Sequence, residues 1–202
     1  MSRIVSTIRS LAQRPYFSNL FSSSRATKRP QSPTNSITTM STSAMEERRW
    51  NRLSEHMNQF HEHFKREFNE LYDLADGSFN KRGMNLRLYL RKADDLCRFL
   101  TNHHTIEERH VFPLLGKRMP EFRANKEHIK SHQGIHDGLD KLTALLEKWK
   151  ADPKEYSPED MRACLDSWRE VLFIHLDAEV RDLGGENLKK YWTLKEVERF
   201  PF

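Results

Sequence analysis

Glycine is scarce in this sequence, and the apolar residues never form a long run. Only 7 of the 202 residues are glycine, whereas charged residues make up 31% of the chain. This composition favours helices, because glycine weakens a helix and charged side chains suit its exposed side. A transmembrane helix needs about 18 or more consecutive apolar residues, and the chain has no such run. The sequence therefore predicts an all-α protein without a membrane span.

Cysteine is equally sparse. The chain has two cysteines, Cys97 and Cys164, and neither belongs to a CxxC pair. Thiolate zinc sites and dithiol redox motifs usually require such pairs, so the sequence supports neither kind of site. We expect both cysteines to be small buried residues in a reducing compartment.

Acidic residues are absent from the first 45 positions. Residues 1–45 carry six basic residues and no Asp or Glu, and the rest of the chain carries 28 basic and 29 acidic residues. The positive charge therefore belongs to this first segment and not to the part that folds. A nucleic-acid partner is not expected, because that function needs clustered positive charge on the fold itself.

The same segment has the features of a mitochondrial transit peptide. It is rich in serine and threonine, and Ile4, Ile8 and Leu11 share one helical face with arginines between them. We therefore expect a leader at 1–45 and a mitochondrial location. A disordered basic tail has the same composition, and in that case the protein would be cytoplasmic.

Four stretches of apolar residues at helical spacing follow the leader. They cover about 46–75, 85–119, 121–150 and 158–183, and glycine or proline lies in each link. Ser157 and Pro158 form a strong start signal for the last helix. Four amphipathic helices with modest links predict an up-down four-helix bundle at 46–185. The aromatic residues of 186–202 predict a tail that packs back on the bundle.

Histidines and their partners recur four positions apart within the predicted helices. Residues four apart lie on one helical face, so an imidazole nitrogen and a carboxylate oxygen can bind one cation together. One such pair is weak support, whereas pairs on three helices indicate a metal site. The pairs are His103/Glu107, His104/Glu108, His132/His136 and His175/Glu179.

Several of these side chains fall within the apolar stripes that must face the core. The predicted ligands are His61, His103, Glu107, His132, His136, His175 and Glu179. Burying a carboxylate costs several kcal/mol unless it is paired or binds a metal. Hydrogen-bonded core histidines, or one buried histidine–glutamate ion pair, are simpler explanations. Five histidines and two glutamates from four helices favour a metal centre over both.

The number of ligands suggests which metal the centre holds. Seven ligands are too many for one tetrahedral zinc ion, and no cysteine joins them. Imidazole binds iron, zinc and copper, and carboxylates can bridge two ions. Two six-coordinate iron ions bridged by both glutamates use the set well, although a mixed or different pair of metals stays open.

The choice of ligands depends on the helical register. His104 and Glu108 repeat the spacing of His103 and Glu107 about 100° around the helix. We prefer His103 and Glu107 because they continue the apolar stripe of Leu100, Val111 and Leu114. We expect His104 and Glu108 to support the site or to lie at the surface. Whether His132 and His136 both bind also stays open. The remaining histidines near these positions are His56, His63, His110 and His128.

These residues resemble the hemerythrin-like (HHE cation-binding) family, in the form common among fungal proteins. Residues 102–115 resemble its second-helix motif, 132–139 its third-helix histidine pair, and His175 with Glu179 its fourth-helix pair. The region 60–64 resembles the place of its first-helix ligand. The similarity covers about 46–185 and implies a non-haem di-iron site. Ordinary hemerythrins have an aspartate five residues after the last histidine, and here a glutamate follows after four.

The resemblance and the ligand set together predict a protein that binds dioxygen, or a related molecule such as nitric oxide, without turnover. Five neutral imidazoles and two carboxylates supply less negative charge than the four-carboxylate sites of di-iron oxidases. Less negative charge should stabilise high-valent iron less well. The alternatives are a di-iron oxidase or peroxidase-type enzyme, an iron-sensing or iron-sequestering protein, and a metal-free helical interaction module.

Overall fold

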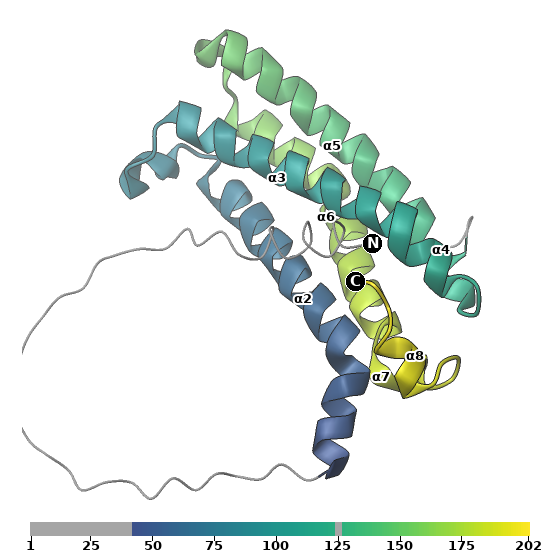
Figure 1. Cartoon of the computed structure of the whole chain (residues 1–202). Helices are drawn as coiled ribbons and strands as arrows, with labels where there is room; N and C mark the ends of the chain where they lie inside the picture. The colour runs from purple at the N-terminus through teal and green to yellow at the C-terminus, as the bar shows by residue number, and fades with distance from the viewer. Residues whose placement is uncertain (1–41, 124–126) are drawn as a thin grey trace, which may run out of the picture.

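The computed structural model describes residues 42–123 and 127–202 (Figure 1). Nearly all of the predicted leader, 1–45, therefore lies outside the described residues. Within the described part of the chain the secondary structure is helical, with no strand. None of the described helices is long and apolar enough to cross a membrane.

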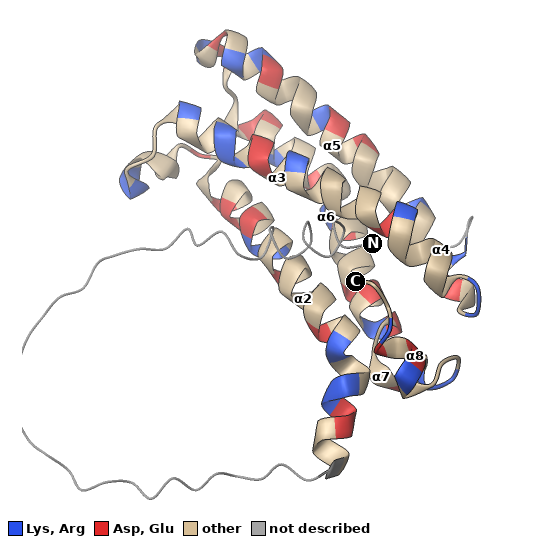
Figure 2. Ribbon diagram, in the orientation of Figure 1, with Lys and Arg blue, Asp and Glu red and all other residues tan. Residues whose placement is uncertain are grey.

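Four long helical segments form the predicted up-down bundle. Helix α2 (Thr42–Leu74) packs beside α3 (Leu86–Ile106), α5 (Glu127–Ala151) packs on α3 and on α6 (Pro158–Asp182), and α6 returns to α2. Each long helix therefore contacts two neighbours, and the four enclose one core, as Figure 1 shows. Basic and acidic residues are interspersed along the long helices (Figure 2).

Local side-chain signals fix where the helices begin and end. The Asn85 side chain accepts a hydrogen bond from the Leu88 amide at 2.9 Å and caps α3. Ser157 caps α6 in the same way, through the Asp160 amide at 3.0 Å, as the sequence predicts. Between α2 and α3, Gly77 has φ 91° and Gly83 has φ 75°, a backbone conformation that other residues rarely adopt.

Two predicted helix boundaries are wrong. The second helix does not continue in a single α-helical register to Met119, because a π-helical turn at Glu107–Val111 separates α3 from the short α4 (Phe112–Leu115). The third long helix begins at Glu127 and not near Glu121, since a separate 3₁₀ turn occupies Pro120–Phe122.

The core divides into two apolar clusters with a polar layer between them. The larger cluster extends from Phe64 on α2 and Leu100 on α3 toward the links at Phe79 and Tyr156. The smaller cluster includes Leu53, Val111 and Leu183. On α2 and α3, the buried histidines and Glu107 lie in sequence between residues of these two clusters, and on α6 Glu179 lies between Leu176 and Leu183. The polar residues are therefore shielded from water by apolar packing on both sides.

Helices α5 and α6 approach closely at a glycine. A Cβ atom at Gly138 would lie 2.2 Å from Cγ of Trp168, far inside van der Waals contact. Gly138 therefore lets the buried Trp168 ring lie directly on the α5 backbone. This close contact fixes the position of α5 along α6, and thus the position of His132 relative to His175.

The C-terminal segment lies against the start of α2. It contains α7 (Gly185–Leu188) and α8 (Leu194–Val197), and the Gly185 amide donates to Oδ1 of Asn51 at 2.8 Å. The buried side chains of Leu188, Trp192 and Val197 belong to the smaller apolar cluster. This segment therefore covers the end of the bundle nearest the polar layer.

Candidate metal centre

The last turn of α3 directs two consecutive histidines into the core. His103 and His104 are 8% and 0% exposed, respectively. Consecutive helical residues point about 100° apart, and both can be buried here because α3 lies between α2 and α5. His103 approaches His61 of α2, with 3.1 Å between their Nε2 atoms. His104 stacks on His132 of α5 with ring centroids 3.8 Å apart.

Glu107 lies one helical turn after both of these histidines. It follows His103 by four residues and His104 by three, the two spacings that place side chains on one helical face. Its Oε1 lies 2.7 Å from Nε2 of His103, and its Oε2 lies 3.4 Å from Nε2 of His132. One buried carboxylate therefore faces imidazoles from α3 and from α5.

The π-helical turn explains why the apolar stripe changes register after Glu107. The Phe112 amide donates to the Glu107 carbonyl, five residues back instead of four. Pro113 has no amide proton, which weakens the α-helical pattern at this point. The extra residue moves the inward positions, so Leu115 is fully buried and Leu114, predicted to face the core, is only half-buried.

The buried donors form two groups that share Glu107. In each group, the candidate ligand atoms all lie within 4.8 Å of one another. The Nε2 atoms of His132 and His175 lie 3.0 Å apart, and those of His61 and His103 lie 3.1 Å apart. Two donors on one ion at right angles, each about 2.1 Å from it, lie about 3.0 Å apart, so both spacings suit a shared ion. The groups are His61, His103, Glu107 and Glu179, and His104, Glu107, His132 and His175.

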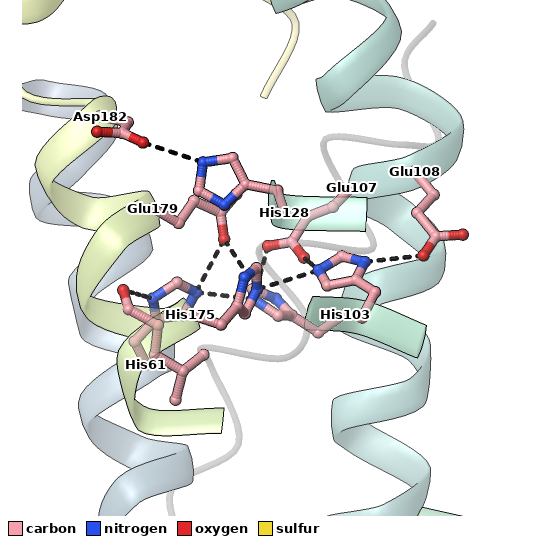
Figure 3. A network of polar contacts seen from close by, with 10 residues as sticks. His61, His103, Glu107, Glu108, His128, His175, Glu179 and Asp182 are labelled. Carbon is pink, nitrogen blue, oxygen red and sulfur yellow. Dashed lines mark hydrogen bonds and ion pairs between the residues drawn. The ribbon is translucent and has the colours of Figure 1, made fainter. Parts of the chain in front are cut away.

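Glu179 of α6 faces both groups as well. Its Oε2 lies 3.6 Å from Nε2 of His61 and 3.7 Å from Nε2 of His175. In Figure 3 its carboxylate points toward these two histidines, across from Glu107. Two carboxylates therefore lie between two sets of imidazoles, an arrangement that suits two neighbouring cations.

Hydrogen bonds outside the groups orient two of the imidazoles. Nδ1–H of His61 donates to the Leu176 carbonyl at 2.9 Å, and Nδ1–H of His132 donates to Oε1 of Glu108 at 2.8 Å. Because a carbonyl and a carboxylate only accept, the proton sits on Nδ1 and the lone pair on Nε2 faces inward. Glu108 thus supports the site from its edge, as Figure 3 shows.

Several buried polar atoms in the centre have no hydrogen-bond partner among the described residues. Both ring nitrogens of His104 and both carboxylate oxygens of Glu179 are in this state, whereas the oxygens of Glu107 face the Nε2 atoms of His103 and His132. Leaving such atoms unpaired costs about 1–3 kcal/mol each, and more for charged groups. Metal ions between the two carboxylates would satisfy them, so the donor set fits a metal centre.

Burial also sets the protonation of these groups. It lowers the pKa of His61 to about 3 and holds the pKa values of His104 and His175 well below their usual value. Burial, together with the charge of Glu107, raises the pKa of Glu179 well above its usual value. Burial opposes the charge of Glu107, but the imidazoles of His103 and His132 outweigh it and hold its pKa low. His61, His104 and His175 are therefore neutral, as metal ligands must be.

The structure brings six of the seven predicted ligands together and leaves one outside. His136 is half-buried and belongs to neither group, although its ring centroid lies 5.4 Å from that of His104. The inward stripe of α5 continues through Ile135 and Leu139, which leaves His136 at its edge. The six residues are His61, His103, Glu107, His132, His175 and Glu179.

His104 occupies a place in the centre that the sequence reasoning did not give it. The preferred pair, His103 and Glu107, lies in the centre, but His104, expected to support the site or to lie at the surface, is fully buried there and shares Glu107. The signal available in the sequence was that Glu107 follows His103 by four residues and His104 by three, so it shares a helical face with both. A further histidine, His128, is buried beside the centre and hydrogen-bonds through Nε2 to Asp182 at 3.1 Å.

Fold and site together define a four-helix bundle protein with a buried histidine and carboxylate centre suited to metal. The family model of the hemerythrin HHE cation-binding domain matches residues 52–185. The chain belongs to this family.

A curated relative and a search of solved structures add two findings. The chain is 31% identical over 100 residues to a dimeric xanthone biosynthesis cluster protein R11 from Cryptosporiopsis sp. (strain 8999). The match covers 46% of the chain and only 37% of that protein. No solved structure matches the chain.

Proposed function

We propose that the protein holds two non-haem iron ions in this centre and binds dioxygen, or a related small molecule such as nitric oxide, without turnover. The observation that carries the proposal is the position of Glu107 and Glu179, each facing imidazoles of both donor groups. A single ion does not require two carboxylates placed in this way, whereas two neighbouring ions do.

Each part of the donor set has a role in this proposal. His61 and His103 would hold one ion, and His104, His132 and His175 would hold the other. Iron would supply the reversible binding of dioxygen. Two carboxylates carry less negative charge than the four of di-iron oxidases, which favours binding over oxidation of a substrate.

The space beside the centre also favours a small ligand. A cavity of about 50 Å³ opens next to His103 and Glu107, between α2 and the π-helical turn. One water molecule needs about 10–15 Å³ of such space, and an engineered cavity that binds benzene measures about 150 Å³. The cavity therefore suits a molecule of two or three atoms better than an aromatic substrate.

A di-iron oxidase or peroxidase-type enzyme is the second candidate. It is favoured by the name of the relative, which places that protein in a biosynthesis cluster. Such an enzyme would need the cavity to enlarge before an organic substrate could reach the centre. Rapid oxidation of small organic substrates by the iron-loaded protein would favour this candidate over a binding protein.

Iron sensing or sequestration is a third candidate, because unpaired buried atoms make the metal-free core unstable. It requires that folding depend on metal. Marked loss of stability in the metal-free protein, without a stable complex with dioxygen or nitric oxide, would favour it.

Metal analysis combined with optical spectroscopy tests the main proposal. We expect two iron ions per chain, and a reversible change in absorption when the anaerobic protein is exposed to air. One iron ion or none per chain would refute the di-iron centre. Two ions with no spectral response to dioxygen or nitric oxide would refute the binding function alone.

The location of the protein is a separate proposal. We propose that residues 1–45 direct the chain to mitochondria, on the basis of their basic and acid-free composition. None of the candidate ligands lies in this segment. A fluorescent fusion of the full chain, compared with one that begins at residue 46, tests it.

A further inference from the structure

The cavity beside the centre has walls that are almost entirely apolar. Side chains such as Met57, Phe60 and Ile106 line it, and its polar lining residues are His56, His103 and Glu107. His103 and Glu107 belong to the donor groups, so their inward atoms are committed to the metal centre. Among the described residues that line the cavity, His56 thus carries the remaining side-chain N–H.

His56 is close to the centre without being part of it. It lies on α2 five residues before His61, and its ring centroid is 5.1 Å from that of Phe60. The Phe60 ring in turn lies 5.8 Å from the ring of His103. All three rings line the same cavity, so a molecule held in it lies beside both His103 and His56.

The imidazole of His56 is free to act as a donor. None of the described residues forms a hydrogen bond with it, and its side chain is half-exposed at the mouth of the cavity. Burial, assisted by the charge of Arg52, lowers its pKa, so the ring is neutral at neutral pH and keeps one N–H. A hydrogen bond made against apolar walls is stronger than one made in water.

We infer that His56 donates a hydrogen bond to the small molecule in this cavity and so favours ligands whose outer end accepts one. This inference rests on the proposed function, because it assumes that a ligand enters beside His103 and Glu107. His56 is then a specificity-determining residue. Dioxygen and azide, which present an accepting end, would be held more tightly than carbon monoxide, which is a weak acceptor.

Azide is a suitable probe, and His63 provides a matched control. His63 lies on the same helix and is exposed; it contacts Phe64 and does not line the cavity. In the iron-loaded protein, His56→Leu should weaken azide binding about 10-fold, the effect of one hydrogen bond to a charged group. His56→Gln, which keeps an N–H, should recover most of the affinity, and His63→Leu should match the wild type.

A second readout does not depend on iron. In zinc-loaded protein, which is diamagnetic, azide should shift the side-chain nitrogen resonances of His56 in an NMR spectrum and leave those of His63 unchanged. Retention of two metal ions by every variant shows that the centre is intact. Equal azide affinity in wild type and His56→Leu, with both metals bound, would overturn the inference and leave the proposed function standing. A wild-type protein that holds two metals but binds neither azide nor dioxygen nor nitric oxide would overturn both the inference and the binding function.

Discussion

Replacing His104 with alanine should remove one metal ion, whereas replacing His136 should not. His104 is fully buried and lies in the group with His132 and His175, while His136 lies at the edge of the inward stripe. The two variants remove the same type of side chain from neighbouring helices, α3 and α5. They therefore separate the ligand set that the structure assembles from the set that the sequence pattern predicts.

The size of the effect follows from what His104 contacts. Loss of a residue that only orients a ligand weakens metal binding about 10–100-fold, so loss of a direct ligand should exceed about 100-fold. This factor corresponds to about 2.7 kcal/mol of lost stabilisation by bound metal. In the metal-free protein the change in stability should be smaller. The cavity left by the ring costs free energy, but two unpaired buried nitrogens disappear with it.

Two measurements decide the outcome. Metal content after dialysis against a moderate chelator should fall from two ions to one in His104→Ala and stay at two in His136→Ala. Urea unfolding with and without iron should show that most of the loss in His104→Ala depends on metal. If His136→Ala loses the ion and His104→Ala keeps it, the α5 register is wrong and our assignment of the second group fails.

Three further predictions test the centre and the packing around it. Glu107→Gln should lose both ions, because each donor group uses this carboxylate. Glu108→Gln should keep two ions with about 10-fold weaker binding, because Glu108 only orients His132. Equal metal content in the two variants would contradict the helical register. Metal uptake should release a proton from Glu179, so metal affinity should rise with pH below its raised pKa and level off above it. A metal affinity that does not change with pH would argue against this. Gly138→Ala should destabilise the protein by about 1–3 kcal/mol because its Cβ would meet Trp168, whereas Gly134→Ala, with 3.6 Å to Val171, should be neutral or stabilising in thermal unfolding.

The fold was predictable because its signals are local. The Ser157 cap, the separated apolar stripes and the scarcity of glycine each specify helices without reference to the rest of the chain. The six histidines and glutamates that the sequence selected lie on those stripes, and burial alone makes a cation their natural partner. Amphipathic spacing was therefore sufficient to predict both the bundle and most of the centre.

The misplaced residues depend on interactions that spacing does not encode. His104 is buried because α3 contacts two neighbours, so a wider arc of the helix faces inward than a single stripe suggests. Leu114 and Leu115 exchange places because of a π-helical turn, which changes the register by one residue. His136 is left outside because Gly138 and Trp168 set how α5 lies on α6. Each of these outcomes is decided by contacts between helices.

The chemistry of the centre explains why metal binding and folding should depend on one another. The pKa of Glu179 is raised in the folded protein. The stability that its neutral carboxyl contributes is therefore fully present below about pH 4.5 and is lost as the pH rises through the raised pKa. The buried histidines act in the opposite sense, because their lowered pKa values contribute stability above about 6.5 that is lost as the pH falls toward 3. No pH therefore suits both kinds of group in the metal-free core. Cations between Glu107 and Glu179 relieve the conflict, since they favour ionised carboxylates and neutral imidazoles together.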